Sequence, residues 1–170
     1  MLMDSRFGLP AERVAALVSR FDRVFAEAPE WLAKRVTERR IVEGHYDLRP
    51  EHVCLCRPPV IIDCLEFSRD LRRVDPFDEL SFLGMECSRL GAPWIGKALI
   101  NHCAQALDDL PDGVLLDFYV TYRACLRTRL ALAQLLDSPP RRADAWLALA
   151  RTYLKMAETA SASLPSPAAR

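Results

Sequence analysis

Residues 44–67 read Gly-His-Tyr-Asp-Leu-Arg-Pro-Glu-His-Val-Cys-Leu-Cys-Arg-Pro-Pro-Val-Ile-Ile-Asp-Cys-Leu-Glu-Phe. Within this stretch two short apolar runs, His52–Cys56 and Val60–Ile62, stand on either side of the tripeptide Arg-Pro-Pro. Short apolar runs that are separated by a tight turn predict a β-hairpin. We therefore expect a hairpin here, in a chain whose remaining pattern is mostly helical.

The rest of the chain has the spacing of helices. Apolar residues recur every three or four positions, which is typical of amphipathic helices. We expect helices over 10–28, 30–40, 76–90, 94–107, 114–136 and 142–160. The last ten residues are rich in serine, proline and alanine, so a disordered tail is expected over 161–170. The expected fold class is mainly α with a small β-hairpin (α+β), and Arg123 and Arg127 on the long helix are expected to be solvated charges.

The composition argues against several classes of protein. A length of 170 residues suits one domain, or one lobe of a larger one. The 23 basic and 23 acidic residues give no net charge, whereas nucleic-acid binding needs a basic excess. No apolar run reaches the roughly 18 residues of a membrane span, and the first ten residues carry no apolar signal region. We therefore expect a cytoplasmic protein with no nucleic-acid and no membrane partner.

Six cysteines are scattered along the chain, at Cys54, Cys56, Cys64, Cys87, Cys103 and Cys125. Without a secretory signal, they are expected to be reduced thiols. Cys54 and Cys56 form a Cys-x-Cys pair, and no second pair follows at zinc spacing. A metal or redox site formed by this pair with His52 stays open as an alternative. Cysteines that alternate along a strand are more typical of a core.

Three residues around the expected hairpin have the chemistry of phosphoryl transfer. That reaction needs a carboxylate to orient the attacking hydroxyl, and a second carboxylate with a neutral ligand to hold Mg²⁺ on the phosphates. Asp47 lies in an expected loop, His52 follows five residues later, and Asp63 comes after the next strand. The hairpin would bring the two aspartates together. The alternative is that both are ordinary turn residues.

The same stretch resembles the catalytic region of the aminoglycoside phosphotransferase-like kinases, which share the protein-kinase-like fold. The signature of that family reads His-Gly-Asp-Leu-His, then an Asn, a strand and Ile-Asp. Its counterparts here are residues 45–49, His52 and Ile62-Asp63. A third segment, Val74–Leu80, resembles the Asp-Pro-x-x-Asp-Leu segment that opens the next helix in these enzymes. The resemblance covers roughly residues 41–135 and is closest to the subgroup often fused to a P-loop ATPase domain.

The resemblance implies an ATP-dependent kinase that acts on a small-molecule alcohol. Asp47 would be the catalytic base, and His45 would brace the catalytic loop. Asp63 and His52 would hold Mg²⁺. Asp75 would cap the helix that starts at the next residue, or bond the loop backbone.

Three residues depart from the family pattern. Tyr46 stands in place of a glycine, and Arg49 in place of a histidine. His52 replaces the asparagine ligand, and imidazole suits Mg²⁺ poorly. A further departure is that no glycine-rich loop and no lysine-bearing strand are visible before residue 45.

The resemblance therefore implies the large C-terminal lobe of a protein-kinase-like fold, with the small N-terminal lobe absent. The expected segments are N-terminal helices over 1–40, a kinase-like lobe over 41–160 and the tail over 161–170. Within the lobe, the catalytic hairpin covers 41–67 and the helices cover 76–160. The segment Gly91–Ala98 matches Gly-x₄-Gly-Lys, but it ends in alanine where a P-loop needs Ser or Thr. We interpret it as the end of one helix, a turn and the next helix.

Besides the thiol-based site, two functions stay open at this point. The chain could be the catalytic lobe of a small-molecule phosphotransferase, inactive alone and completed by a nucleotide-binding lobe or ATPase domain in a partner or in a longer chain. ATP and Mg²⁺ are then the implied cofactors, and no cofactor-binding residues beyond the metal ligands are expected. Alternatively, the chain is a non-catalytic, pseudokinase-like binding or scaffold protein.

Overall fold

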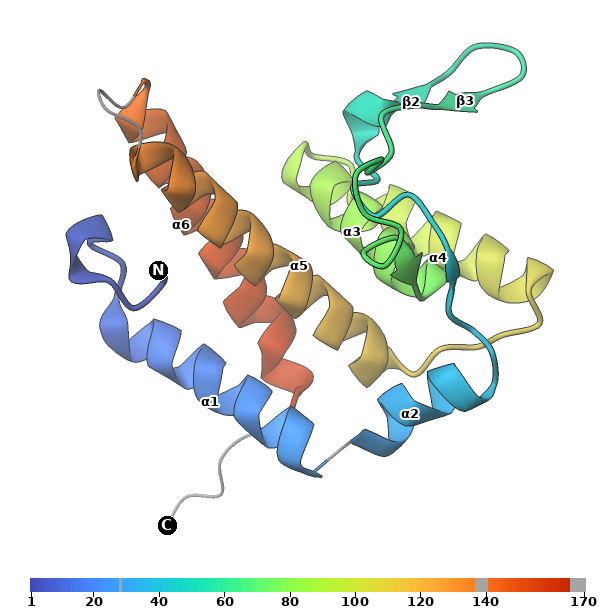
Figure 1. Cartoon of the computed structure of the whole chain (residues 1–170), viewed down its shortest axis with the longest axis horizontal. Helices are drawn as coiled ribbons and strands as arrows, with labels where there is room; N and C mark the ends of the chain where they lie inside the picture. The colour runs from blue at the N-terminus through green and yellow to red at the C-terminus, as the bar shows by residue number, and fades with distance from the viewer. Residues whose placement is uncertain (28, 137–140, 166–170) are drawn as a thin grey trace. The chain divides into compact units, whose positions relative to one another are not determined.

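The computed structural model describes residues 1–27, 29–136 and 141–165 and is mostly helical (Figure 1). Its α-helices are α1 (Ala11–Glu27), α2 (Pro29–Thr37), α3 (Pro76–Arg89), α4 (Trp94–Ala106), α5 (Gly113–Ala133) and α6 (Ala143–Ala160). Its strands are β1 (Val42–Glu43), β2 (Val53–Cys54), β3 (Val60–Ile61) and β4 (Arg73–Val74). The expected α+β class, mainly α with a small hairpin, is confirmed. Within the described ranges, no helix combines the length and the apolar character that a membrane crossing requires.

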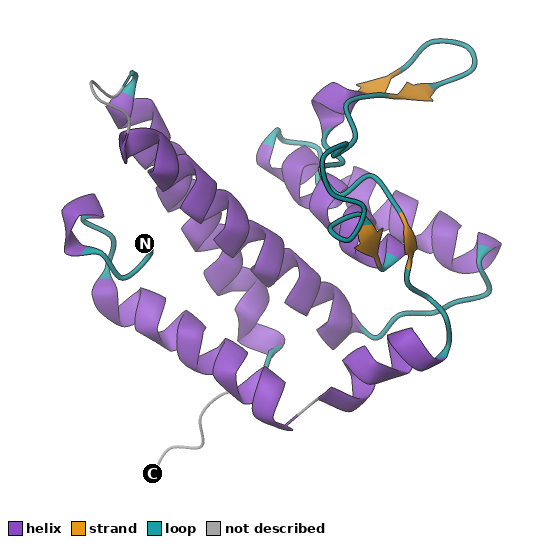
Figure 2. Cartoon of the chain, viewed as in Figure 1, coloured by secondary structure: helices purple, strands orange, loops and turns teal. Residues whose placement is uncertain are grey.

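The four strands form two short antiparallel pairs (Figure 2). Strands β2 and β3 make the predicted hairpin, with Val53 opposite Ile61. Strands β1 and β4 form a second pair, at Val42 and Val74, which was not predicted from the sequence. A two-residue strand is too short to show the alternation by which a strand is predicted. The β1–β4 pair brings together the two ends of the segment that contains the hairpin.

The chain divides into two compact units, and helix α5 contributes to both. One unit comprises Met1–Pro29 and Val120–Arg170, and the other comprises Glu30–Tyr119. This division follows contacts within the fold, whereas the predicted segments 1–40, 41–160 and 161–170 follow a family resemblance. The predicted segments therefore stay a prediction.

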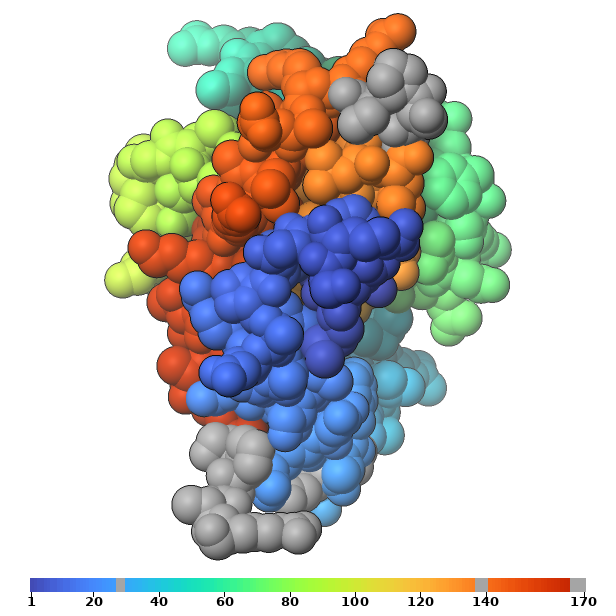
Figure 3. Space-filling model, turned by 90° about the vertical axis from the view of Figure 1, so that its left-hand side faces the viewer, coloured from blue at the N-terminus to red at the C-terminus, as the bar shows by residue number. Residues whose placement is uncertain are grey.

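The first unit is a helical cluster around a small apolar core. Phe7, Ala131, Leu132 and Ala150 are buried together there. Figure 3 shows α1 and α6 side by side on one face of this unit, and the two helices are also in contact through an ion pair between Arg13 and Glu158. The unit is thus held mainly by helix packing.

Two expectations about the first unit are wrong. Residues Ser161–Ser163 form a 3₁₀ helix and Leu164 is only 3% exposed, so the predicted disordered tail does not begin at residue 161. Burial of the apolar Leu164 side chain stabilises the folded chain. The guanidinium of Arg20 also donates a hydrogen bond to the carbonyl oxygen of Ser161. Residues 166–170 of that tail lie outside the described residues. Arg123, expected in solvent, is 1% exposed.

Helices α3 and α4 form the framework of the second unit, and they cross at two glycines. A Cβ atom added to Gly84 would lie 2.8 Å from the Cα atom of Gly96, so only glycine permits this approach. Gly96 and Ala98 lie inside α4, as expected if the Gly-x₄-Gly-Lys match is not a P-loop. Leu48, Leu83 and Cys87 are buried together and join the loop before the hairpin to this framework.

A buried ion-pair network fixes the start of α3. Asp75 is the N-cap of α3 and accepts a hydrogen bond from the Phe77 amide at 2.9 Å, which confirms the expected cap. Its carboxylate also accepts hydrogen bonds from the Arg35 guanidinium and, at 3.0 Å, from the Tyr119 hydroxyl. Arg35 makes a second, bidentate pair with Asp109, at 2.7 and 2.8 Å. The ion pair with Arg35 lowers the pKa of Asp109.

Candidate functional site

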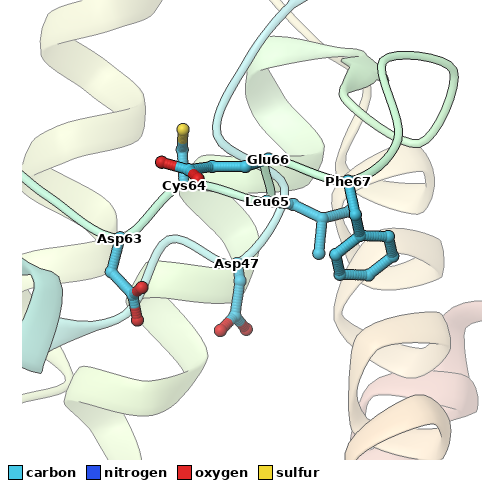
Figure 4. A pocket seen from close by; sticks show the side chains of 6 residues that line it. All are labelled: Asp47, Asp63, Cys64, Leu65, Glu66 and Phe67. Atoms are coloured by element: carbon cyan, nitrogen blue, oxygen red, sulfur yellow. The ribbon is translucent and has the colours of Figure 1, made fainter.

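A shallow cavity of about 350 Å³ lies beside the hairpin. Two of the predicted site residues, Asp47 and Asp63, line it, and Figure 4 shows their carboxylates pointing the same way. The remaining lining residues are Cys64, Leu65, Glu66 and Phe67. Three of the six lining side chains are therefore acidic, and none of the described lining residues is basic.

Backbone and side-chain hydrogen bonds join the two segments that carry these aspartates. The Ile62 amide donates to the His52 carbonyl at 3.0 Å, and the Leu65 amide donates to the His45 carbonyl at 3.2 Å. The His45 ring nitrogen Nε2 lies 2.7 Å from the Ile62 carbonyl oxygen and must donate to it. Asp63 therefore sits beside the loop of Asp47, with His45 as one of the links between them.

Both site segments contain a residue in the left-handed backbone region. Tyr46 has a φ of 71° and Asp63 a φ of 61°. Aspartate tolerates this region, whereas for a bulky residue such as tyrosine it costs energy. Tyr46 thus has a backbone conformation that glycine adopts without strain, at a position where the resembled family has glycine. Such strain persists only where neighbouring structure holds it in place.

The neighbouring structure at Tyr46 is the side chain of Glu79 on α3. The Tyr46 amide donates a hydrogen bond to Glu79 Oε1. The same carboxylate lies against Gly44, where an added Cβ atom would be 2.7 Å from Glu79 Oε2. Glu79 therefore holds the backbone on the N-terminal side of Asp47, and the absence of a side chain at Gly44 makes room for it.

His52 and Arg49 lie beside the two aspartates. His52 is buried, and its Nδ1 lies 2.8 Å from the Asp47 carbonyl oxygen. Its Nε2 lies 3.2 Å from Asp63 Oδ2 and 3.0 Å from Arg49 Nη2. Arg49 also contacts Asp47, with Nε and Nη2 each 3.1 Å from Oδ2. All four predicted site residues, His45, Asp47, His52 and Asp63, therefore lie in one region.

These residues do not fit a magnesium ion as they lie. Mg²⁺ demands oxygen ligands in octahedral geometry, and His52 offers a ring nitrogen. The guanidinium of Arg49 already contacts the Asp47 carboxylate and Nε2 of His52, where a metal ion would have to bind. Among the described residues, no group of three or more His, Cys, Asp or Glu side chains could hold a metal ion. The acidic lining equally does not suit a bare triphosphate, because like charges repel.

The cysteine pair does not have the burial that was expected. Cys54 and Cys56 are both exposed, so the interpretation as core residues is wrong for them. The hairpin strands are only two residues long, and both residues of β3 are exposed as well. The described part of the chain also places no metal-binding group around this pair.

Sequence reasoning missed two residues of this site, Glu79 and Arg49. Glu79 stands at the second acidic position of the Asp-Pro-x-x-Asp-Leu-like segment, which is the signal that could have identified it. For Arg49 the signal was its departure from the family pattern. The contact of Glu79 does not follow from local spacing, since Tyr46 and Glu79 are 33 residues apart.

Comparisons with known proteins leave the family of this chain unassigned. It is similar to the uncharacterized proteins Rv2004c and MT2060 of Mycobacterium tuberculosis and Mb2027c of Mycobacterium bovis, with 34% identity over 109 residues in each case. The match covers 64% of this chain, but only 22% of each relative. No family model matches the chain, and no solved structure matches it.

Proposed function

We propose that this chain is the large, acceptor-side lobe of a small-molecule phosphotransferase related to the aminoglycoside phosphotransferase-like kinases. The observation that carries the proposal is the shared cavity of Asp47 and Asp63. The two residues come from different segments of the motif, and a hairpin lies between them, as in the resembled catalytic region. The backbone anchor at Glu79 supports the proposal further, because it comes from the third motif.

In this proposal Asp47 orients and deprotonates the acceptor hydroxyl. A carboxylate in that role must lie within hydrogen-bond reach of the substrate oxygen, and Asp47 is partly exposed at the cavity. His45 keeps the two site segments together. The γ-phosphate of ATP would be presented by a nucleotide-binding lobe or ATPase domain in a partner or a longer chain, since the cavity lining does not suit it. All six cysteines are free thiols, which supports a cytoplasmic location where ATP is available.

The test is transfer of labelled γ-phosphate from ATP to a panel of small alcohols. The 170-residue chain is compared with longer forms that include adjoining domains. We expect Asp47→Ala to reduce transfer by at least a hundredfold, because general base catalysis contributes roughly 10²–10⁴. The matched control is Asp70→Ala, which removes another exposed carboxylate of the same unit. Transfer that survives Asp47→Ala would overturn the assignment of Asp47.

A second candidate function is a non-catalytic, pseudokinase-like binding protein. The observation that favours it is the Arg49 guanidinium on Asp47, because an ion-paired carboxylate is not available to a substrate hydroxyl. This function predicts no thermal shift with ATP and Mg²⁺. A ligand at a hundred times its dissociation constant stabilises a protein by about 2.7 kcal/mol. A shift of several degrees that Asp63→Asn abolishes would therefore exclude it.

A further inference from the structure

The outer edge of strand β3 is open. Next to the paired strands, the Ile62 amide donates to the His52 carbonyl at 3.0 Å, so residues 52 and 62 form a hydrogen-bonded pair. Bonded and non-bonded pairs alternate along an antiparallel ladder. Val53 and Ile61, one step along the register, are therefore a non-bonded pair. The amide and the carbonyl of Ile61 consequently point away from β2, and no described residue bonds to either of them.

The outer edge of β2, by contrast, is occupied by the chain itself. The 3₁₀ helix Pro50–His52 leads directly into β2, and its Pro50 carbonyl accepts the hydrogen of the Val53 amide. That amide is the one that faces away from β3, because Val53 belongs to the non-bonded pair. Figure 2 shows the hairpin projecting from the helices of its unit. β3 is therefore the edge of this hairpin at which a further strand can pair.

The side chains along this edge are apolar and lie in water. Val60, Ile61 and Ile62 are 45%, 56% and 47% exposed. Leu55 before them and Phe67 after them are 89% and 84% exposed. β-branched residues are enriched in strands, because they pack well against the neighbouring strand. Three consecutive β-branched residues on an open edge favour pairing with another strand.

This edge is complementary to a second copy of itself. When two β3 strands pair antiparallel about Ile61, the outward amide of each Ile61 meets the outward carbonyl of the other. Val60 then faces Ile62 of the copy, so apolar side chains meet apolar side chains. Arg57 precedes the strand and Asp63 follows it, so each arginine comes near the aspartate of the other copy. A parallel pairing would instead place like charges side by side, which is unfavourable.

We propose that the open edge of β3 is a dimerisation site, at which a second copy of this chain adds its own β3 strand antiparallel about Ile61. The same patch is used on both copies, so the assembly closes at two chains. Pro59 has no amide to continue the ladder, which limits the pairing to Val60–Ile62. An edge this short gives an interface of the weak, transient class. The inference does not depend on the proposed phosphotransferase.

The test is sedimentation equilibrium of the full chain over concentrations up to the millimolar range. We expect a reversible equilibrium between monomer and dimer. Ile61→Lys should raise the dissociation constant at least tenfold, because two ammonium groups would then meet directly across the pair. Leu110→Lys is the matched control, since it makes the same change at another exposed apolar position of this unit. It should leave the dissociation constant unchanged.

A cross-link tests the register of the pairing separately. The exposed thiols Cys54, Cys56 and Cys64 are first replaced by serine. In that background Ile61→Cys should form a disulfide between two copies under mild oxidation. Residues at a bonded antiparallel position have Cα atoms about 5.5 Å apart, which is within the reach of a disulfide. Leu110→Cys in the same background should form none.

Three results would overturn the inference. The first is an unmodified chain that stays monomeric at every concentration, which would leave the edge to a strand of another protein or of a longer chain. The second is an equal dissociation constant for Ile61→Lys and Leu110→Lys. The third is a dimer in which Ile61→Cys forms no cross-link, because the copies would then meet elsewhere. If Ile61→Lys does not fold, Ile61→Thr replaces it, since threonine keeps the β-branched shape and should still weaken the dimer.

Discussion

At the scale of single residues, the candidate site depends on backbone conformations that its residues do not favour. Tyr46, which precedes Asp47, has a left-handed backbone conformation, and so does Asp63, a predicted metal ligand. Glu79 accepts the Tyr46 amide hydrogen and holds the first of these conformations. The backbone immediately before Asp47 is therefore held by a side chain on another element.

The strain at Tyr46 leads to a testable prediction for two substitutions. Tyr46→Gly should change the free energy of unfolding by less than about 1 kcal/mol, because relief of left-handed strain offsets the entropy that glycine loses. Tyr46→Val should lower it by about 1–3 kcal/mol, since a β-branched residue is an outlier at this φ. Urea denaturation measures both. A valine variant as stable as the glycine variant would show that Tyr46 is not strained.

At the scale of elements, the crossing of α3 and α4 controls where Leu48 and its loop can sit. Gly84 and Gly96 let the two backbones approach, and α3 then presents Leu83 and Cys87 to Leu48. The same helix carries Glu79. One helix pair thus positions the apolar anchor and the polar anchor of the Asp47 loop.

The close crossing predicts that Gly84→Ala destabilises the protein even though alanine favours helices. The new Cβ atom would meet backbone at Gly96, which cannot move aside as a side chain can. Overpacking of this kind costs about 1–3 kcal/mol, and α3 and α4 would have to separate. Thermal denaturation should show a Tm lower by several degrees.

The matched control for this prediction is Gly113→Ala at the start of α5. A Cβ atom there has nothing within 4 Å, so the change should be neutral or stabilising by up to about 1 kcal/mol. If both variants had the same Tm as the unmodified chain, the close approach of the two helices would be contradicted.

At the scale of the whole molecule, stability should depend on pH through groups that the fold buries. Asp109 has a lowered pKa because it pairs with Arg35, so its contribution is complete above pH 4 and is lost as the pH falls through its folded-state value. Tyr119 has a raised pKa because burial, and then the nearby charge of Asp75, disfavour its ionised form. Its contribution is complete below pH 10 and is lost as the pH rises above that value.

The alkaline dependence can be assigned with one variant. We expect the free energy of unfolding to fall by up to about 1.4 kcal/mol per pH unit above pH 10 for Tyr119, and Tyr119→Phe should remove that share. Burial also raises the pKa of Cys125 to about 12, so part of the fall begins near pH 9 and remains in the variant. Urea midpoints at pH 7 to 11 give the measurement. An unchanged slope in Tyr119→Phe above pH 10 would contradict the role given to Tyr119.

The sequence by itself determined the helices, the hairpin and the order of the site motifs. These depend on neighbours within a few residues, such as the apolar runs around residues 57–59 and the cap at Asp75. It also indicated that Asp47 and Asp63 would meet, because a hairpin joins them.

The tertiary structure alone decided which charges are buried and what each one contacts. Arg35 and Arg123 are buried by segments that are distant in the chain. Strand β1 likewise pairs with the distant β4, and Glu79 on α3 holds the loop of Asp47. The contacts of Arg49 are near in sequence, but the loop conformation that permits them is set by α3 through Glu79. The physical reason is that burial and ion pairing depend on all neighbours in space, whereas helical and strand patterns depend on neighbours along the chain.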